Sequence, residues 1–163
     1  SEIGRGSGSK VYLVRHQKLG VYRAVKRIFK DSDAVRKVWE ATILSRLKHP
    51  RIPKIYDVEE DENAYYLIEE YIEGESLEAL MLQSSFITPD FITQIIQEVA
   101  DVLDYLHHAP NGPFIYQDLK AEHILIGKDG VKLIDFGIAA SLNESGNKFQ
   151  NYGTPKFCPP EKM

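Results

Sequence analysis

The sequence has 163 residues, 43% of them hydrophobic and 27% charged, which is ordinary for a soluble globular domain and sufficient for two small lobes. A net charge of −4 argues against nucleic-acid binding, and no apolar run approaches the ~20 residues that span a bilayer. The single cysteine, Cys158, excludes an intramolecular disulfide, which fits a reducing compartment, so we expect a cytoplasmic protein. A membrane anchor outside this sequence would not be visible in it.

The chain opens with strands and a helix. Glu2-Ile3-Gly4 reads as the inside of a strand rather than as a beginning. Residues 11–14 and 22–28 are short β-branched or aromatic runs on either side of a turn at 18–20, which predicts a β-hairpin. Residues 35–47 then keep a helical spacing of apolar side chains that ends before Pro50.

Two more strands and a second helix follow. Residues 52–58 and 64–72 predict strands around an acidic turn. Thr88 and Pro89 form an N-cap followed by proline, which predicts the start of an amphipathic helix. We expect its apolar stripe to be core, namely Phe91, Ile92, Ile95, Ile96, Val99, Val102, Leu103 and Leu106.

The last third predicts a short hairpin and a long polar segment. Residues 124–126 and 131–134 read as strands joined by a turn at 127–130. From Gly137 onward the sequence is polar and typical of a loop.

Two features of the first part suit phosphate binding. Gly4, Gly6 and Gly8 lie in a strand-turn-strand setting, where the lack of Cβ atoms lets backbone N–H groups approach phosphate oxygens. Lys26 lies on an apolar strand, and Glu40 on the following helix is a candidate partner. Each feature alone also fits a plain structural reading: a glycine-rich hairpin, a surface lysine and a surface ion pair.

Asp118 and Asp135 each stand at a strand–loop boundary on either side of the second hairpin. Two carboxylates brought together in this way suit metal and proton chemistry. Taken singly, each aspartate equally fits an ordinary turn.

The order of these motifs is more specific than any one of them. A Gly-rich hairpin, strand lysine, helix glutamate, D-L-K loop, D-F-G and final P-P-E follow one another as in protein kinases. The chain strongly resembles this family over nearly all its length, with a catalytic-loop spelling that indicates a divergent, bacterial type. The resemblance implies an α+β fold: a small antiparallel β-sheet lobe with one helix, followed by the first part of a mainly helical lobe.

The implied lobes are residues 1–72, with a hinge at 70–72, and residues 73–163. The helices that follow the P-P-E motif in the family are absent from this sequence. We expect that the apolar surface which those helices would cover can mediate dimerisation.

The resemblance also implies ATP and Mg²⁺ as cofactors and protein serine or threonine hydroxyls as acceptors. Asp118 and Lys120 would be catalytic, together with Lys26, which holds the phosphates, and Glu40, which pairs with Lys26. Asp135 would bind Mg²⁺, and Thr154 would face the acceptor residue. The other implied ATP contacts are Gly4, Gly6, Gly8, Val11, Ala24, Glu70, Ile72 and Leu125.

Several positions depart from the family pattern. Ser9 replaces the third loop glycine, and Glu69 is an unusual carboxylate at the position guarding the back of the adenine pocket. His123 replaces the asparagine that binds a second Mg²⁺. Because imidazole is a poorer Mg²⁺ ligand than an amide oxygen, we expect a weaker second metal site and relatively better activity with Mn²⁺.

Two more departures precede Asp118. Gln117 replaces the arginine that pairs with a phosphorylated activation loop, so we expect activity without phosphorylation of that segment. Its candidate acceptors are Ser141, Ser145 and Tyr152. Tyr116 replaces a histidine at a packing position beside Phe136, and we expect the aromatic exchange to be tolerated.

Three functions fit these residues. The first is a serine/threonine protein kinase, favoured by joint retention of the implied catalytic residues. The second is a pseudokinase or nucleotide-binding regulatory module without efficient transfer, favoured by His123 and Gln117. The third, a small-molecule phosphotransferase, is disfavoured by the D-F-G and P-P-E motifs.

Overall fold

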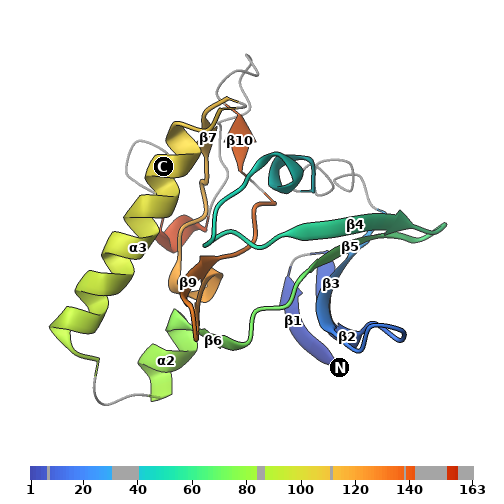
Figure 1. Ribbon diagram of the computed structural model, residues 1–163, viewed down its shortest axis with the longest axis horizontal. Coiled ribbons are helices and arrows are strands. Elements are labelled where there is room, and N and C mark those ends of the chain that lie inside the picture. Colours follow the sequence, from blue (N-terminus) through green and yellow to red (C-terminus); the bar gives the residue numbers. More distant parts are fainter. Residues whose placement is uncertain are drawn as a thin grey trace. The chain divides into compact units, whose positions relative to one another are not determined.

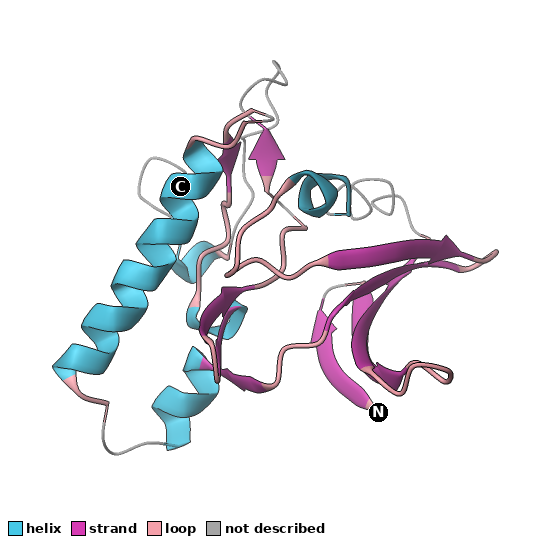
Figure 2. Cartoon of the chain, in the orientation of Figure 1, coloured by secondary structure: helices cyan, strands magenta, loops and turns pink. Residues whose placement is uncertain are grey.

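A computed structural model describes residues 1–6, 8–30, 41–83, 87–110, 112–137, 139–141 and 154–157 of the chain. It divides into two compact units, residues 1–48 with 53–72 and residues 49–52 with 73–163. The ribbon in Figure 1 and the cartoon in Figure 2 show the elements of both.

The first unit is built on an antiparallel sheet with the strand order β1-β2-β3-β5-β4 (Figure 1). Its strands are β1 (Glu2–Gly6), β2 (Ser9–Arg15), β3 (Tyr22–Phe29), β4 (Ile55–Glu60) and β5 (Ala64–Glu70). The predicted β2–β3 hairpin is confirmed, with Gly20 at φ +71° in its turn. Glycine suits that position because it adopts positive φ without steric cost.

One face of this sheet carries the core of the unit. Ile28 and Leu67 are fully buried on adjacent strands and pack with Ala41, with partly buried Ile55 and Tyr65 against them. Residues 41–46 are helical, as predicted. The earlier part of the predicted helix lies outside the described residues.

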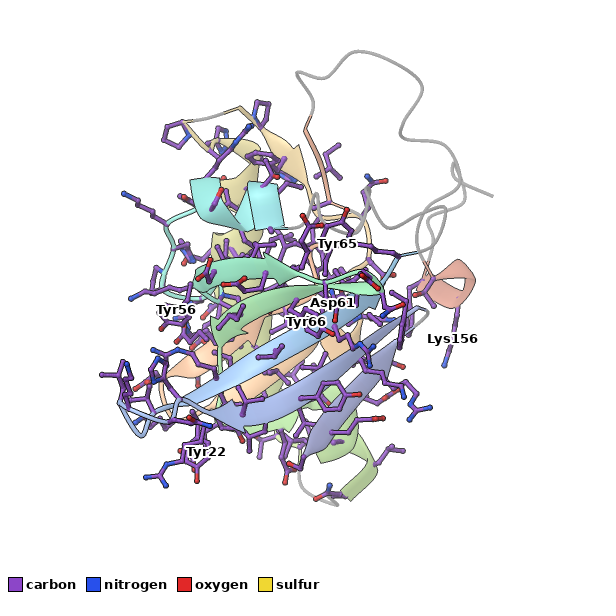
Figure 3. The ribbon with its side chains drawn as sticks, turned by 90° about the vertical axis from the view of Figure 1, so that its right-hand side faces the viewer. Tyr22, Tyr56, Asp61, Tyr65, Tyr66 and Lys156 are labelled. Atoms are coloured by element: carbon purple, nitrogen blue, oxygen red, sulfur yellow. The ribbon has the colours of Figure 1, made fainter. Side chains whose placement is uncertain are left out.

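The turn between β4 and β5 is organised by Asp61 (Figure 3). Its Oδ1 accepts hydrogen bonds from the backbone N–H groups of Asn63 at 2.7 Å and Ala64 at 2.8 Å. Its Oδ2 accepts one from the hydroxyl of Tyr66 at 2.7 Å, and this bond is the largest of the influences that lower the pKa of Asp61. An aspartate whose side chain accepts the backbone N–H groups of its own turn is a short-range signal, and it fixes where β5 begins.

The second unit contains the helices α2 (Leu77–Gln83) and α3 (Pro89–His107). The predicted N-cap of α3 is confirmed, because Thr88 Oγ1 accepts the N–H of Phe91 at 3.2 Å. Helix α2 was not predicted. None of the helices in the described part of the chain is both long and apolar enough to cross a membrane.

The predicted apolar stripe of α3 is only partly core. Ile95, Val99, Val102 and Leu106 are buried, as expected. Ile96 is 61% exposed, so its assignment to the core was wrong. At 3.6 residues per turn, Ile96 lies about 100° around the helix from Ile95 and leaves the buried stripe.

Two small sheets complete this unit. The strands β6 (Gly74–Ser76), β8 (Ile124–Gly127) and β9 (Gly130–Leu133) pair in the order β6-β8-β9. The predicted hairpin is β8–β9. Strand β7 (Phe114–Ile115) pairs with β10 (Ala140–Ser141), which lies in the stretch predicted to be loop.

Residues 49–52 join the second unit through a polar anchor. Arg51 Nη1 lies 2.7 Å from Glu98 Oε2 on α3, and the same carboxylate oxygen accepts the N–H of Val131 at 2.8 Å. The N–H of Leu133 donates to the carbonyl of Arg51 at 2.9 Å. These bonds hold residues 49–52 in place within the second unit. The strand that was predicted to begin at residue 52 therefore begins only at Ile55.

Candidate active site

The loop between β7 and β8 lies in the second unit and carries the predicted catalytic residues Asp118 and Lys120. It ends in the 3-10 helix η1 (Ala121–His123). Gln117 adopts φ +69°, in the left-handed region that a non-glycine residue rarely enters. The backbone of Asp118 donates to the carbonyl of Tyr116 at 3.1 Å, which makes the loop turn tightly before the aspartate.

Tyr116 fixes the loop to the segment that carries Asp135. Its ring is buried and meets Phe136 edge-on, with centroids 5.1 Å apart. Its hydroxyl donates to the backbone carbonyl of Ile134. The expected aromatic packing is therefore confirmed, and the hydroxyl bond is an addition that a histidine ring would not make in the same way.

Asp118 is held by Thr154, from a distant part of the sequence. Its Oδ1 accepts the hydroxyl of Thr154 at 2.8 Å and the backbone N–H of the same residue at 3.0 Å. The Asp118 side chain is only 15% exposed. These two hydrogen bonds to Oδ1 orient the carboxylate and leave Oδ2 without a bond to Thr154.

Lys120 lies on the Oδ2 side of Asp118. Its Nζ is 3.6 Å from that oxygen, 3.0 Å from Glu122 Oε2 and 3.4 Å from the Thr154 hydroxyl, to which it donates. Burial works to lower the pKa of Lys120, but the bond to Glu122 and the charge of Asp118 outweigh it and raise the pKa. The lysine is thus a stable cation. Glu122 was not predicted, because its spacing in the sequence carries no distinguishing signal.

His123 lies between the two aspartates. Its Nδ1 is 3.0 Å from the backbone carbonyl oxygen of Asp118, and its Nε2 is 3.5 Å from Asp135 Oδ2. Burial, the largest influence, lowers the pKa of His123, against the opposing charges of Asp135 and Asp118. The ring therefore links the two carboxylate residues that were predicted separately.

Asp135 follows β9 and adopts φ +63°. Its side chain is 43% exposed, and its Oδ1 accepts the N–H of Gly137 at 3.4 Å. Among the residues that the structure describes, no three histidine, cysteine, aspartate or glutamate side chains form a metal cluster. A metal at this position would have few protein ligands, in the manner of Mg²⁺ sites completed by substrate phosphates and water.

The glycine-rich hairpin belongs to the first unit. Gly4 pairs with Val11, and Gly6 pairs with Ser9, the residue at the position of the third expected glycine. Gly8 adopts φ +75° near the tip. The strand-turn-strand setting predicted for these glycines is confirmed by the pairing of β1 with β2.

Lys26 lies on β3 beside Ala24, two positions along the same face. Lys26 pairs with Leu67 of β5, and Ala24 pairs with Glu69. Because directly paired residues point to the same face, Lys26 and Glu69 are diagonal neighbours on it. The structure thus brings the unusual carboxylate to the face that carries the lysine.

The remaining predicted ATP contacts are divided between the units. Glu70 ends β5 and Ile72 follows it in the first unit, whereas Leu125 lies on β8 in the second. Glu40 lies outside the described residues.

Comparison with known proteins then decides the family. A family model described as "Protein kinase domain" matches residues 1–163. The chain belongs to the protein kinase family. This confirms the family predicted from the motif order, and the sheet-based first unit agrees with the predicted kinase fold.

Individual relatives of this kinase chain come from distant organisms. It is 34% identical over 164 residues to sperm motility kinase 2B of Mus musculus, covering 99% of the chain and 33% of the relative. It is 30% identical over 167 residues to a cAMP-dependent protein kinase catalytic subunit-like protein of Caenorhabditis elegans, covering 99% and 41%. It is 31% identical over 170 residues to the probable serine/threonine-protein kinase PknB of Lactococcus lactis, covering 99% and 27%. The chain thus spans between about a quarter and two fifths of these relatives.

Proposed function

We propose that this chain carries ATP-dependent phosphoryl transfer to serine and threonine hydroxyls of proteins. The observation that carries the proposal is the arrangement around Asp118: one carboxylate oxygen held by Thr154, and the other beside the cationic Lys120. A phosphoryl-transfer site depends mainly on positioning and on charge neutralisation, and this cluster supplies both.

Asp118 is proposed to receive the proton of the acceptor. As the acceptor hydroxyl oxygen bonds to the γ-phosphorus of ATP, the bond from that phosphorus to the bridging oxygen breaks and ADP leaves. The hydroxyl proton passes to Asp118 Oδ2, because Oδ1 is already bonded to Thr154. Lys120 is proposed to neutralise charge that develops on the transferred phosphoryl group.

The other groups are proposed to hold ATP and its metal. Lys26, paired with Glu40, would hold the phosphates, and Asp135 would hold Mg²⁺, whose charge neutralises phosphate oxygens when it is bound. Carboxylate oxygens such as those of Asp135 are the ligands that Mg²⁺ prefers.

The nucleotide's remaining contacts are proposed as follows. The backbone around Gly4, Gly6 and Gly8 would cover the phosphates. Val11, Ala24 and Leu125 would enclose the adenine ring, and the backbone of Glu70 and Ile72 would bind its edge. In this proposal residues 1–72 and 73–163 act as the two lobes, and the protein works in the cytoplasm.

We propose serine and threonine as the acceptors on the basis of Lys120 and Thr154. Both residues contact Asp118 directly. Relatives such as the Lactococcus lactis protein carry a serine/threonine kinase name, which supports the same choice for this chain.

A binding-only module is the second candidate, favoured by the position of His123 against both Asp118 and Asp135. A transfer assay separates the two. The full-length protein is incubated with radiolabelled ATP, Mg²⁺ or Mn²⁺, and a protein acceptor, beside Asp118→Asn. Label transferred by the wild type and lost in Asp118→Asn supports the enzyme. ATP bound by the wild type without transfer under either metal supports the module.

A further inference from the structure

Thr154 leads directly into a short turn that carries an exposed cation. The 3-10 helix η2 (Pro155–Phe157) follows it, and the N–H of Phe157 donates to the carbonyl of Thr154 at 2.8 Å. Because Thr154 is bonded to Asp118 through both its hydroxyl and its N–H, η2 is attached to the loop of the proposed catalytic aspartate. Lys156 lies two residues beyond Thr154, a stretch that the chain spans in at most ~7 Å.

The side chain of Lys156 is exposed, and Figure 3 shows it extending away from η2. Its Nζ lies 5.5 Å from the centre of the Phe157 ring, within the ~6 Å of a cation–π contact. Phe157 is itself 50% exposed. The ring therefore gives the ammonium group a preferred position and leaves it accessible from the solvent.

Lys120 also carries a positive charge near Asp118, but this charge is shared between two carboxylates. Its Nζ is 3.0 Å from Glu122 Oε2 and 3.6 Å from Asp118 Oδ2. The same ion pair neutralises Glu122, whose side chain is 50% exposed and would otherwise repel an acidic substrate. A substrate carboxylate therefore finds its accessible partner at Lys156 rather than at Lys120, whose side chain is 14% exposed.

We propose that Lys156 is a specificity-determining residue that binds an aspartate or glutamate side chain lying within two residues of the acceptor serine or threonine. An extended peptide advances ~3.3–3.6 Å per residue, so two residues span the same ~7 Å that separates Lys156 from Thr154 along the chain. The net charge of the chain is −4, which gives no long-range attraction for acidic substrates. The preference should therefore depend on where the acidic residue stands. The inference rests on the proposed function, because Asp118 and Thr154 define the place of the acceptor.

A set of matched peptides tests this with the full-length protein. The peptides share one serine and differ at a single position, which carries aspartate, asparagine or lysine and is moved through the two residues on each side of the serine. Phosphate transfer gives kcat/KM for each peptide. The same peptides with alanine in place of the serine are titrated into protein loaded with a non-hydrolysable ATP analogue, and fluorescence anisotropy measures their binding without any transfer.

The variants are Lys156→Gln, which removes the charge, and Lys156→Glu, which reverses it. Lys128→Glu is the matched control, since Lys128 is an exposed lysine in the turn of the β8–β9 hairpin of the same unit. In the wild type and in Lys128→Glu, we expect aspartate to be preferred over asparagine by about three- to fivefold in at least one position, as for one solvent-exposed ion pair. The preference should vanish in Lys156→Gln and turn toward lysine in Lys156→Glu. Transfer to the asparagine peptide by Lys156→Gln should stay within about twofold of the wild type.

Equal use of the aspartate and asparagine peptides by the wild type at all four positions would overturn the inference, as would a preference for aspartate that persists in Lys156→Glu. The binding measurement keeps this inference apart from the proposed function. Transfer without any preference for aspartate leaves the proposed function standing and rejects the role of Lys156. Binding that prefers aspartate and depends on Lys156, without transfer, supports the acidic-peptide site and rejects the enzyme. Neither transfer to nor binding of any peptide rejects both.

Discussion

The hydroxyl of Thr154 donates a 2.8 Å hydrogen bond to the carboxylate of Asp118, across 36 positions of the chain. The backbone N–H of the same threonine binds the same carboxylate oxygen at 3.0 Å. In the proposed mechanism, this pair of bonds leaves Oδ2 of Asp118 for the acceptor. It joins the predicted catalytic aspartate to the predicted acceptor-facing residue.

Variants of Thr154 should therefore separate the contribution of its hydroxyl to the transfer rate from that of its backbone N–H. Thr154→Val keeps the shape but removes the hydroxyl, and we expect kcat of phosphate transfer to fall about tenfold, as for a lost transition-state bond worth about 1.4 kcal/mol. Thr154→Ser keeps the hydroxyl and should retain most of the rate. Steady-state kinetics of both variants check this, and equal rates for wild type and Thr154→Val would contradict it.

Tyr116 should contribute to stability through both its ring and its hydroxyl. Tyr116→Phe retains packing on Phe136 but leaves the Ile134 carbonyl without that donor, which we expect to cost about 1–2 kcal/mol of unfolding free energy. Tyr116→Ala also creates a cavity and should cost about 3–5 kcal/mol. Urea unfolding of the two variants measures the difference. Similar losses for both would mean that ring packing contributes little.

The anchor between Arg51 and Glu98 should make stability depend on pH. Burial opposes ionisation of Glu98, but the Val131 N–H, the Gln94 amide and the Arg51 charge together lower the pKa of its carboxyl below the ordinary 4.5. A lowered folded-state pKa contributes stability that is present above the ordinary value and is lost as pH falls through the folded one. We expect Glu98→Gln to cost about 1–3 kcal/mol at neutral pH.

Unfolding of wild type and Glu98→Gln at several pH values checks this. The two stability curves should converge as the pH falls from 4.5 through the lower pKa of the folded Glu98 carboxyl, where that carboxyl becomes protonated. Glu78→Gln, at an exposed glutamate in helix α2 of the same unit, serves as a control and should leave the curve unchanged. A constant gap between wild type and Glu98→Gln at all pH values would show that charge is not the cause.

Gln117 predicts activity that is independent of phosphorylation. Its amide lacks the charge needed to hold a phosphate group, so phosphatase treatment should change the transfer rate by less than about twofold. In Gln117→Arg, phosphorylation should instead alter the rate. Of the three candidate acceptors, Ser145 and Tyr152 lie outside the described residues, and Ser141 ends β10. A large rate gain on phosphorylating the wild type would refute this prediction.

Long elements and ordered motifs could be predicted from the sequence, because their signals are local. Thr88 and Pro89 mark the start of α3, and the β-branched and aromatic run at residues 22–28 marks β3. Strands of two or three residues, such as β7 and β10, have too few positions for any periodicity to appear. Ile96 shows the limit in a helix, since being apolar does not place a side chain on the buried stripe.

The candidate site, like the fold, could be predicted from the sequence only in part. Asp118, Lys120 and Asp135 could be named from motif order, and so could the unusual His123. Their contacts could not, because the bond between Thr154 and Asp118 and the position of His123 between two aspartates depend on three-dimensional folding. Spacing along the chain gives no signal for such long-range pairs.

The central claim is that Asp118 performs catalysis rather than only lying in a nucleotide site. The most direct measurement is the rate of phosphate transfer from saturating ATP to a serine or threonine peptide by wild type and Asp118→Asn, with the ATP dissociation constant of each determined in parallel. We predict a fall of about 100-fold or more in the rate, as for loss of a general base, with ATP affinity changed by less than about threefold. Equal transfer rates for the two proteins, at equal ATP affinity, would contradict the claim.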